Sequence, residues 1–181
     1  MAAPEPVDLS PGEWAVLGVV AEGPTHGFAV AQLVGPAGEL GRIWTLPRPF
    51  VYQALKKLTA AGFIAARATE ASDRGPQRTI VAATAAGRGA VAAWLSRPVD
   101  HVRDIRSLFL LKLALLDRAG ADARSLVAAQ HRALVPQVAG LEARRDQAEG
   151  FERTLAAWRL ESCHAAIRFL AAWTPQPAER S

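Results

Sequence analysis

Cysteine is nearly absent from this sequence, since Cys163 is the single one in 181 residues. An internal disulfide and a zinc site built from several cysteines are therefore excluded, which is typical of a protein from a reducing compartment. Residues 1–9 contain two acidic residues but no basic residue and no apolar run, so they do not resemble a secretory signal. We expect the protein to be cytoplasmic.

Long hydrophobic runs are also lacking. The one apolar stretch that invites a membrane interpretation, residues 108–116, is interrupted by Lys112 and has about half of the ~20 residues that a spanning helix needs. A buried core helix explains it better. Charged residues make up 21% of the chain and hydrophobic residues 50%, which excludes disorder of the chain as a whole. A chain of this length forms one ordinary domain or two small ones.

Lysine and arginine are missing from residues 1–41, which carry five acidic residues and a net charge of −5. Residues 42–97, in contrast, hold nine basic and two acidic residues, a net charge of +7. Such a basic segment is typical of a protein that binds a polyanion, because each cation placed near a phosphate releases a condensed counterion. A solvated surface would carry the same charge, and charge alone does not separate the two interpretations.

Helical signals precede and enter this basic segment. Residues 10–13, Ser-Pro-Gly-Glu, form a capping box with proline in the first turn, which predicts a helix that ends at Gly23. Thr25 can cap a second short helix that runs to Val34. A glycine-rich loop follows at residues 35–41.

A third helix begins within residues 47–49 and runs to Ala61. At 100° per residue its apolar and polar side chains fall on opposite faces. The apolar stripe consists of Val51, Ala54, Leu55 and Leu58. The opposite face consists of Gln53, Lys56 and Lys57. One face is therefore expected to pack, while the other remains polar and basic.

Two short strands follow at residues 63–68 and 78–83. They predict a hairpin with a polar and basic tip at residues 71–77. Thr84 then caps another helix, which ends at residues 97–98. Three helices, a basic hairpin and a further helix are typical of a winged helix-turn-helix, in which the third helix enters the major groove of DNA.

This arrangement makes the third helix and the hairpin the candidate DNA-binding site. Gln53, Lys56 and Lys57 can reach bases or phosphates. The hairpin tip carries three polar residues, Arg74, Gln77 and Arg78. They can place it on the DNA backbone or in the minor groove. Tyr52, at the edge of the apolar stripe, either offers its hydroxyl to a phosphate or simply packs.

Beyond Pro98 the composition changes to long helical patterns rich in alanine, leucine and arginine. Helices are predicted at residues 103–118, 122–149 with a kink at Pro136, and 151–173. We therefore expect two domains, a winged-helix domain at residues 9–98 and a helical domain at residues 99–174.

The last helix has apolar residues on two sides. One stripe contains Leu155, Trp158, Ser162, Ala165 and Phe169, and the other contains Leu160, Cys163, Ile167 and Leu170. Such a helix needs two partners, of which a second subunit can be one. A three-helix bundle within one chain is the alternative. We expect a homodimer formed through Leu155, Trp158, Ile167, Phe169 and Leu170.

The motifs of the first domain resemble those of the PadR-like transcriptional regulators. The matching segments cover most of residues 9–98 in the family's order and spacing: LG at 17–18, EGPTHGF at 22–28, VYQALKKL at 51–58, GFI at 62–64, RGPQR at 74–78 and TAAG at 84–87. The resemblance implies a mainly α fold, with a winged helix-turn-helix domain, a two-stranded wing and a C-terminal helical dimerisation region. It also implies a homodimer that binds a palindromic operator in double-stranded DNA, usually as a repressor, and that a small aromatic or amphipathic effector releases.

Three positions depart from the usual family pattern. Phe28 and Val81 stand where tyrosine is common, and Pro47-Arg48-Pro49 replaces a small polar lead-in to the recognition helix. Phe28 lacks a hydroxyl that could bind a phosphate. Arg48 can compensate, because a guanidinium beside a helix N-terminus can bind phosphate or guanine.

Trp14, Trp94 and Trp158 are the candidate effector-binding residues, since aromatic side chains can line a cavity between helices. Plain core packing is the alternative. The four histidines are scattered in the sequence, so we expect no metal site, and no motif indicates a cofactor.

Enzymatic activity is not expected. The sequence lacks a phosphate-cradling glycine-rich loop, a nucleophile elbow and paired metal ligands. A helical adaptor that binds protein through its winged-helix domain is the other alternative, and the +7 segment argues against it.

Overall fold

The computed structural model describes residues 9–72 and 75–173, with side chains described outside residues 69–77. Its contacts divide the chain into two compact units, Met1–Trp94 and Leu95–Ser181. The division falls within helix α4 (Ala85–Ser96). The sequence-based domains at 9–98 and 99–174 stay a prediction, because contact units do not establish domains that fold independently.

Helix α1 (Pro11–Glu22) begins at the predicted capping box. The Glu13 backbone N–H donates to Ser10 Oγ at 3.4 Å, and the Ser10 backbone N–H donates to Glu13 Oε2 at 2.8 Å. Both bonds satisfy donors that the start of a helix leaves without partners in the helix itself. Val16, Leu17 and Val20 are completely buried, so α1 supplies much of the core of unit 1.

The start of the second helix differs from the prediction. Thr25 is not the cap, because Thr25–His26 forms the short strand β1, and His26 caps helix α2 (Gly27–Leu33). His26 Nδ1 accepts a hydrogen bond from the Ala29 backbone N–H at 3.1 Å. The backbone of Thr25 pairs instead with Val81 of strand β3 (Gly75–Ala83), a partner that local sequence patterns do not reveal.

Helix α3 (Arg48–Ala60) follows a 3₁₀ turn, η1 (Leu40–Arg42), and starts at the predicted pair of prolines. The predicted apolar stripe is confirmed, since Val51 and Leu58 are completely buried and Ala54 is 2% exposed. Gly62 has a φ of +74°, a left-handed conformation that favours glycine, and it follows the end of the helix.

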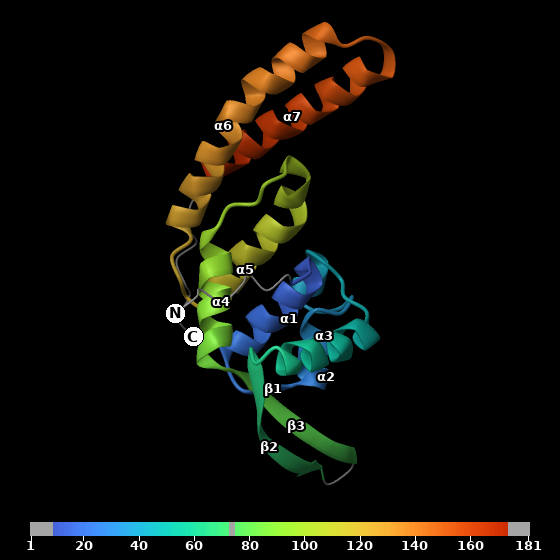
Figure 1. Cartoon of the computed structure of the whole chain (residues 1–181), viewed down its shortest axis with the longest axis vertical. Helices are drawn as coiled ribbons and strands as arrows, with labels where there is room; N and C mark the ends of the chain where they lie inside the picture. The colour runs from blue at the N-terminus through green and yellow to red at the C-terminus, as the bar shows by residue number, and fades with distance from the viewer. Residues whose placement is uncertain (1–8, 73–74, 174–181) are drawn as a thin grey trace. The chain divides into compact units, whose positions relative to one another are not determined.

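Strands β2 (Ile64–Ser72) and β3 form an antiparallel hairpin that is longer than predicted. Pairing with β1 extends it to a three-stranded sheet of order β1-β3-β2, so the expected two-stranded wing is part of a larger sheet. Figure 1 shows the hairpin projecting from the helices of unit 1.

Helix α4 begins after the wing. Thr84 Oγ1 accepts a hydrogen bond from the Gly87 backbone N–H at 3.1 Å, which confirms the predicted cap. A side chain at Gly87 would collide with the Phe63 carbonyl, so glycine permits the close approach of α4 to the wing. Together, α1 to α4 and the hairpin form a winged helix-turn-helix.

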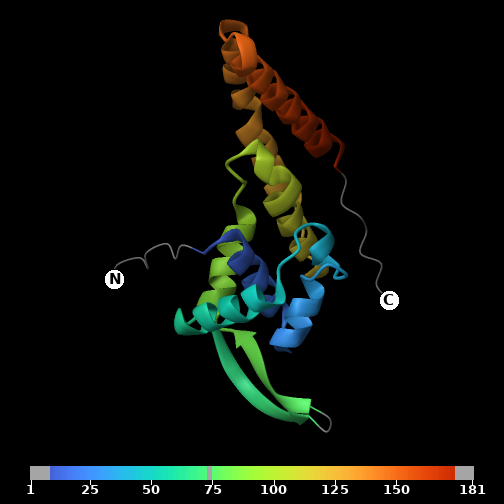
Figure 2. The ribbon, with the colours of Figure 1, turned by 90° about the vertical axis from the view of Figure 1, so that its right-hand side faces the viewer.

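Unit 2 contains the remaining helices: η2 (Val102–Asp104), η3 (Ile105–Phe109), α5 (Leu110–Arg118), α6 (Arg124–Gln147) and α7 (Gly150–Ala172). The single helix predicted at residues 103–118 therefore begins with a 3₁₀ turn and a π-helical turn before α5. Helices α6 and α7 form a long antiparallel hairpin (Figure 2), and α6 continues through Pro136. Within residues 9–72 and 75–173, no helix has both the length and the apolar character needed to cross a membrane.

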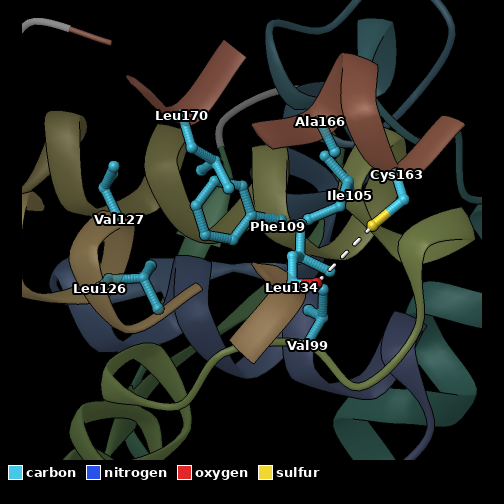
Figure 3. Close-up of a cluster of buried hydrophobic side chains, with 9 residues drawn as sticks. All are labelled: Val99, Ile105, Phe109, Leu126, Val127, Leu134, Cys163, Ala166 and Leu170. Carbon is cyan, nitrogen blue, oxygen red and sulfur yellow. Dashed lines mark hydrogen bonds between the residues drawn. The ribbon is translucent and has the colours of Figure 1, made fainter. Parts of the chain in front are cut away.

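The core of unit 2 forms where the start of the unit meets α6 and α7. Figure 3 shows its members: Val99, Ile105, Phe109, Leu126, Val127, Leu134, Cys163, Ala166 and Leu170. Phe109 is completely buried and Leu111 is 1% exposed, which confirms a buried helix in the apolar stretch 108–116. The Cys163 thiol lies 3.8 Å from the Leu134 carbonyl oxygen, and burial raises its pKa.

Two buried polar side chains hold the segment that precedes η2. Gln130 of α6 is completely buried; its Oε1 accepts from the Val99 N–H at 2.6 Å, and its Nε2 donates to the Val99 carbonyl at 3.0 Å. Lys112 of α5 donates to the Arg97 carbonyl at 2.6 Å. Burial lowers the pKa of Lys112 to about 8, although the nearby Asp100 carboxylate raises it.

We predict that Gln130→Ala lowers the free energy of unfolding by about 2–3 kcal/mol, because it leaves both backbone groups of Val99 without their side-chain partner and opens a cavity. Chemical denaturation followed by circular dichroism measures this. Gln137→Ala is the matched control on the same helix, since the Gln137 side chain donates to the Ala133 carbonyl one turn earlier. It should change stability by no more than about 0.5 kcal/mol. Equal effects of the two substitutions would contradict the assigned role of Gln130.

Candidate nucleic-acid interface

The polar face of α3 is exposed as predicted. Gln53, Lys56 and Lys57 are exposed, and so are Arg48 at the first turn and Tyr52, which is 45% exposed. Because Val51 and Leu58 on the other side of the helix are buried, the domain holds α3 with this face outward.

A cleft of about 490 Å³ lies beside this face, and we call it the α3 cleft. It is formed by the start of α2, by α3 and by β3. Its lining residues are His26, Gly27, Phe28, Arg48, Tyr52, Leu55, Lys56, Thr59, Arg78, Thr79 and Val81. Four of the predicted DNA-binding residues are thus brought together, namely Arg48, Tyr52, Lys56 and Arg78.

The electrostatics of the α3 cleft favour an anion. Arg48, Lys56 and Arg78 contribute three cations, and none of the residues that line it is Asp or Glu. Arg78 is exposed on β3. A concave surface of one sign concentrates the electrostatic potential and raises the local concentration of an oppositely charged ligand.

Phe28 gains a role that the sequence did not indicate. The guanidinium carbon of Arg48 lies 5.1 Å from the centroid of the Phe28 ring and 5.9 Å from that of Tyr52, both within cation–π range. Phe28 therefore stacks on Arg48 and orients it. This role is additional to the loss of the hydroxyl that a tyrosine would have at this position. No local sequence pattern indicates this contact, because Phe28 and Arg48 are distant in the sequence and meet only through the packing of the fold.

Tyr52 is fixed from one side by the start of α2. A side chain at Gly27 would come within 2.8 Å of the Tyr52 ring, so glycine leaves the space in which this ring lies. Tyr52 consequently packs with one edge and exposes the other, and both of its predicted roles are compatible with this position.

Lys57 differs from its neighbour Lys56. Its Nζ lies 2.8 Å from Glu13 Oε2 in α1, although the side chain is 51% exposed. Burial raises the pKa of Glu13, but hydrogen bonds from Lys57 and Ser10 lower it further, so the net pKa is below the ordinary value. Lys57 therefore forms an ion pair within unit 1, and its predicted contact with DNA stays a prediction.

The tip of the wing is only partly described. Gln77 belongs to β3, but its side chain lies outside the described residues, as does the whole of Arg74. The predicted contacts of these two residues with DNA stay a prediction.

The three candidate effector-binding tryptophans do not form one site within a unit. Trp14 and Trp94 stack on each other in unit 1, with ring centroids 5.3 Å apart and planes 3° from parallel. Trp158 belongs to unit 2, where it is 71% exposed and lines a groove of about 730 Å³. The groove, which we call the α7 groove, is formed by residues of η2, η3 and α5 and by the outer side of α7.

The five predicted dimerisation residues lie on different sides of α7. Leu170 is 3% exposed and belongs to the core of unit 2, and Ile167 packs against that core. These two face their own chain because they share the side of Leu160 and Cys163. Leu155, Trp158 and Phe169 lie on the other side, along the α7 groove.

A family of known proteins matches part of this chain. Residues 16–93 match the model of the "Transcriptional regulator PadR-like family". The negative transcriptional regulator PadR of Bacillus subtilis is 28% identical over 100 residues, which are 55% of this chain and 53% of that protein. The chain thus matches about half the length of this curated relative.

The solved structures to which this chain is similar include two of the Bacillus subtilis protein. The structure of its complex with operator DNA matches this chain with a TM-score of 0.48 and 21% sequence identity. The match covers 90% of this chain and 97% of the chain in that structure. Its complex with p-coumaric acid has a TM-score of 0.44 and 20% identity, and covers 90% and 96%. A Streptococcus mutans protein has a TM-score of 0.44 and 15% identity, and covers 88% and 96%. Residues 16–93, which include α3 and the wing, are thus similar to the PadR-like family of transcriptional regulators.

Proposed function

We propose that this protein regulates transcription by binding a specific DNA sequence through α3 and the wing. The observation that carries the proposal is the α3 cleft, where Arg48, Lys56 and Arg78 meet beside the exposed face of α3 without a carboxylate among the lining residues. A protein-binding adaptor would not require three cations there. Catalysis is not part of the proposal.

The proposed contacts divide into two kinds. Arg48, Lys56 and Arg78 neutralise phosphates and position the protein on the duplex, whereas Gln53 reaches base edges. Glutamine pairs with adenine through two hydrogen bonds in the major groove. The rings of Phe28 and Tyr52 hold Arg48 in place before DNA arrives, which reduces the conformational entropy that binding costs.

We propose further that the protein is a homodimer that binds a palindromic operator as a repressor. Support comes from the outer stripe of α7, which consists of Phe151, Leu155, Trp158, Ser162, Ala165 and Phe169. Its members alternate spacings of four and three residues, and all but the half-buried Leu155 and Ser162 are exposed. This is the spacing of apolar positions in a coiled-coil seam. Phe151 and Trp158 are 75% and 71% exposed in the single chain, and an exposed apolar surface of this kind is typical of an interface. Two recognition helices about 34 Å apart would then read two half-sites.

A small aromatic or amphipathic effector is proposed to act at the α7 groove. Trp158 and Phe169 offer an apolar surface there, and Arg103, Arg106 and Arg159 offer cations for a carboxylate. The groove shares Trp158 and Phe169 with the outer stripe. An occupant would therefore alter the packing of the second subunit and, with it, the spacing of the recognition helices.

We predict that Arg48→Ala and Lys56→Ala each weaken DNA binding and reduce the slope of log affinity against log salt by about 0.9, the value for one lost phosphate contact. DNA selected from a genomic library with the purified protein, followed by gel shift across a salt series, measures this. Arg153→Ala, which removes an exposed cation of unit 2, is the control and should leave the slope unchanged. Wild-type slopes in both α3 variants would contradict the proposed interface.

Trp158→Ala should raise the dissociation constant of the dimer by at least about 30-fold, because a large aromatic side chain at the centre of an interface contributes about 2 kcal/mol or more. Sedimentation velocity over a concentration series measures the change. The control is Val135→Ala, which trims an apolar side chain of α6 that is 47% exposed and outside the stripe. An unchanged sedimentation profile of the Trp158 variant would exclude the outer stripe as the interface.

With p-coumaric acid as an aromatic carboxylate probe, we predict release of the selected DNA from the wild type. Arg159→Ala should require about tenfold more of the probe, since an ion-paired hydrogen bond contributes about 1.5 kcal/mol. Arg168→Ala removes another exposed arginine of α7 that does not line the groove, and it should respond as the wild type. If the two variants respond alike, the effector does not bind at the α7 groove.

A further inference from the structure

Glu13 and Lys57 connect the start of α1 to the recognition helix. Lys57 Nζ lies 2.8 Å from Glu13 Oε2, and the two residues are 44 positions apart in the sequence. The exposed fractions of the two side chains differ strongly, with 51% for Lys57 and 11% for Glu13. A mostly buried carboxylate therefore holds an ammonium that lies on the exposed face of α3.

The carboxylate is fixed independently of Lys57. The Ser10 backbone N–H donates to the same Glu13 Oε2 at 2.8 Å, and the Ser10 hydroxyl accepts from the Glu13 backbone N–H. The first turn of a helix also favours a negative charge. Gly12 permits a close approach at this point, because a side chain there would lie 2.6 Å from the Phe50 ring of α3. Glu13 is thus a rigid anchor on the side of α1 that meets α3.

This anchor divides the two lysines of α3 into different roles. Successive residues of a helix point about 100° apart, and Lys56 lines the α3 cleft whereas Lys57 is directed to α1. The charge of Lys57 is offset by that of Glu13. A long lysine side chain without such an anchor can follow any nearby phosphate, and a contact of this kind adds affinity for every DNA sequence alike.

We propose that Glu13 is a specificity-determining positioning residue, which withholds the Lys57 ammonium from the DNA backbone and so lowers affinity for non-operator DNA relative to operator DNA. The inference rests on the proposed DNA-binding function. It assigns to α1, a helix that supplies the core of unit 1, a part in discrimination between sequences.

Glu13→Gln tests the inference, because glutamine also serves at this position of a capping box but carries no charge. Gel shift with a random-sequence duplex and with the selected operator is carried out across a salt series. On random-sequence duplex, we expect the slope of log affinity against log salt to steepen by about 0.9. The affinity for this duplex at 0.15 M salt should rise about fivefold, which is the effect of one added phosphate contact. The ratio of operator affinity to random-duplex affinity should fall.

Three further variants separate this effect from others. Glu22→Gln removes the same charge from the last residue of α1 and should keep the wild-type slope. Lys57→Met alone should also keep the wild-type slope, because the Lys57 ammonium is already withheld from the DNA backbone. Lys57→Met added to Glu13→Gln should restore the wild-type slope. Thermal unfolding of each variant confirms that the proteins compared are folded.

The outcomes that overturn the inference are distinct from failure of the proposed function. If Lys57→Met flattens the slope as Lys56→Ala does, Lys57 contacts phosphate in the wild type and Glu13 does not withhold it. If the double variant keeps the steeper slope, the effect is general repulsion by the Glu13 charge. An unchanged Glu13→Gln slope also overturns the inference while DNA binding stands, whereas a wild type that binds no DNA overturns both.

Discussion

The burial of one side of α3 is the constraint on which the proposed DNA-binding surface depends. Val51 and Leu58 are completely buried, and burial of such a side chain contributes about 1.5–3 kcal/mol. The helix cannot rotate about its axis without exposing them to water, so the directions of its polar side chains are fixed as well. Arg48 and Lys56 therefore reach the α3 cleft because of residues that do not themselves line it.

Features that arise from neighbouring residues were accessible from the sequence. The capping box of α1 and the orientation of α3 follow from residue types at fixed spacing, and the structure confirms both. The cap of α2 did not follow. Threonine is the better cap by residue preference, but strand pairing with Val81 takes up the backbone of Thr25 and moves the start of the helix to the residue after His26.

The candidate site depends more on contacts between distant elements, and these were not predictable. The Glu13–Lys57 ion pair and the placement of Arg48 over Phe28 both require the angle at which α3 packs on its neighbours. Periodicity likewise found two apolar stripes on α7 but could not tell which stripe faces its own chain. Leu170 belongs to the inner stripe because Phe109 and α6 cover that side, a fact of tertiary packing.

The burial of Cys163 determines how the protein responds to oxidants. A thiol reacts with peroxides and with disulfides as its thiolate, and burial both raises the thiol pKa and blocks access to the sulfur. The sulfur lies against the Leu134 carbonyl in the core of unit 2. Because the sequence has no other cysteine, an oxidant can reach a thiol of this chain only after unit 2 opens around Cys163.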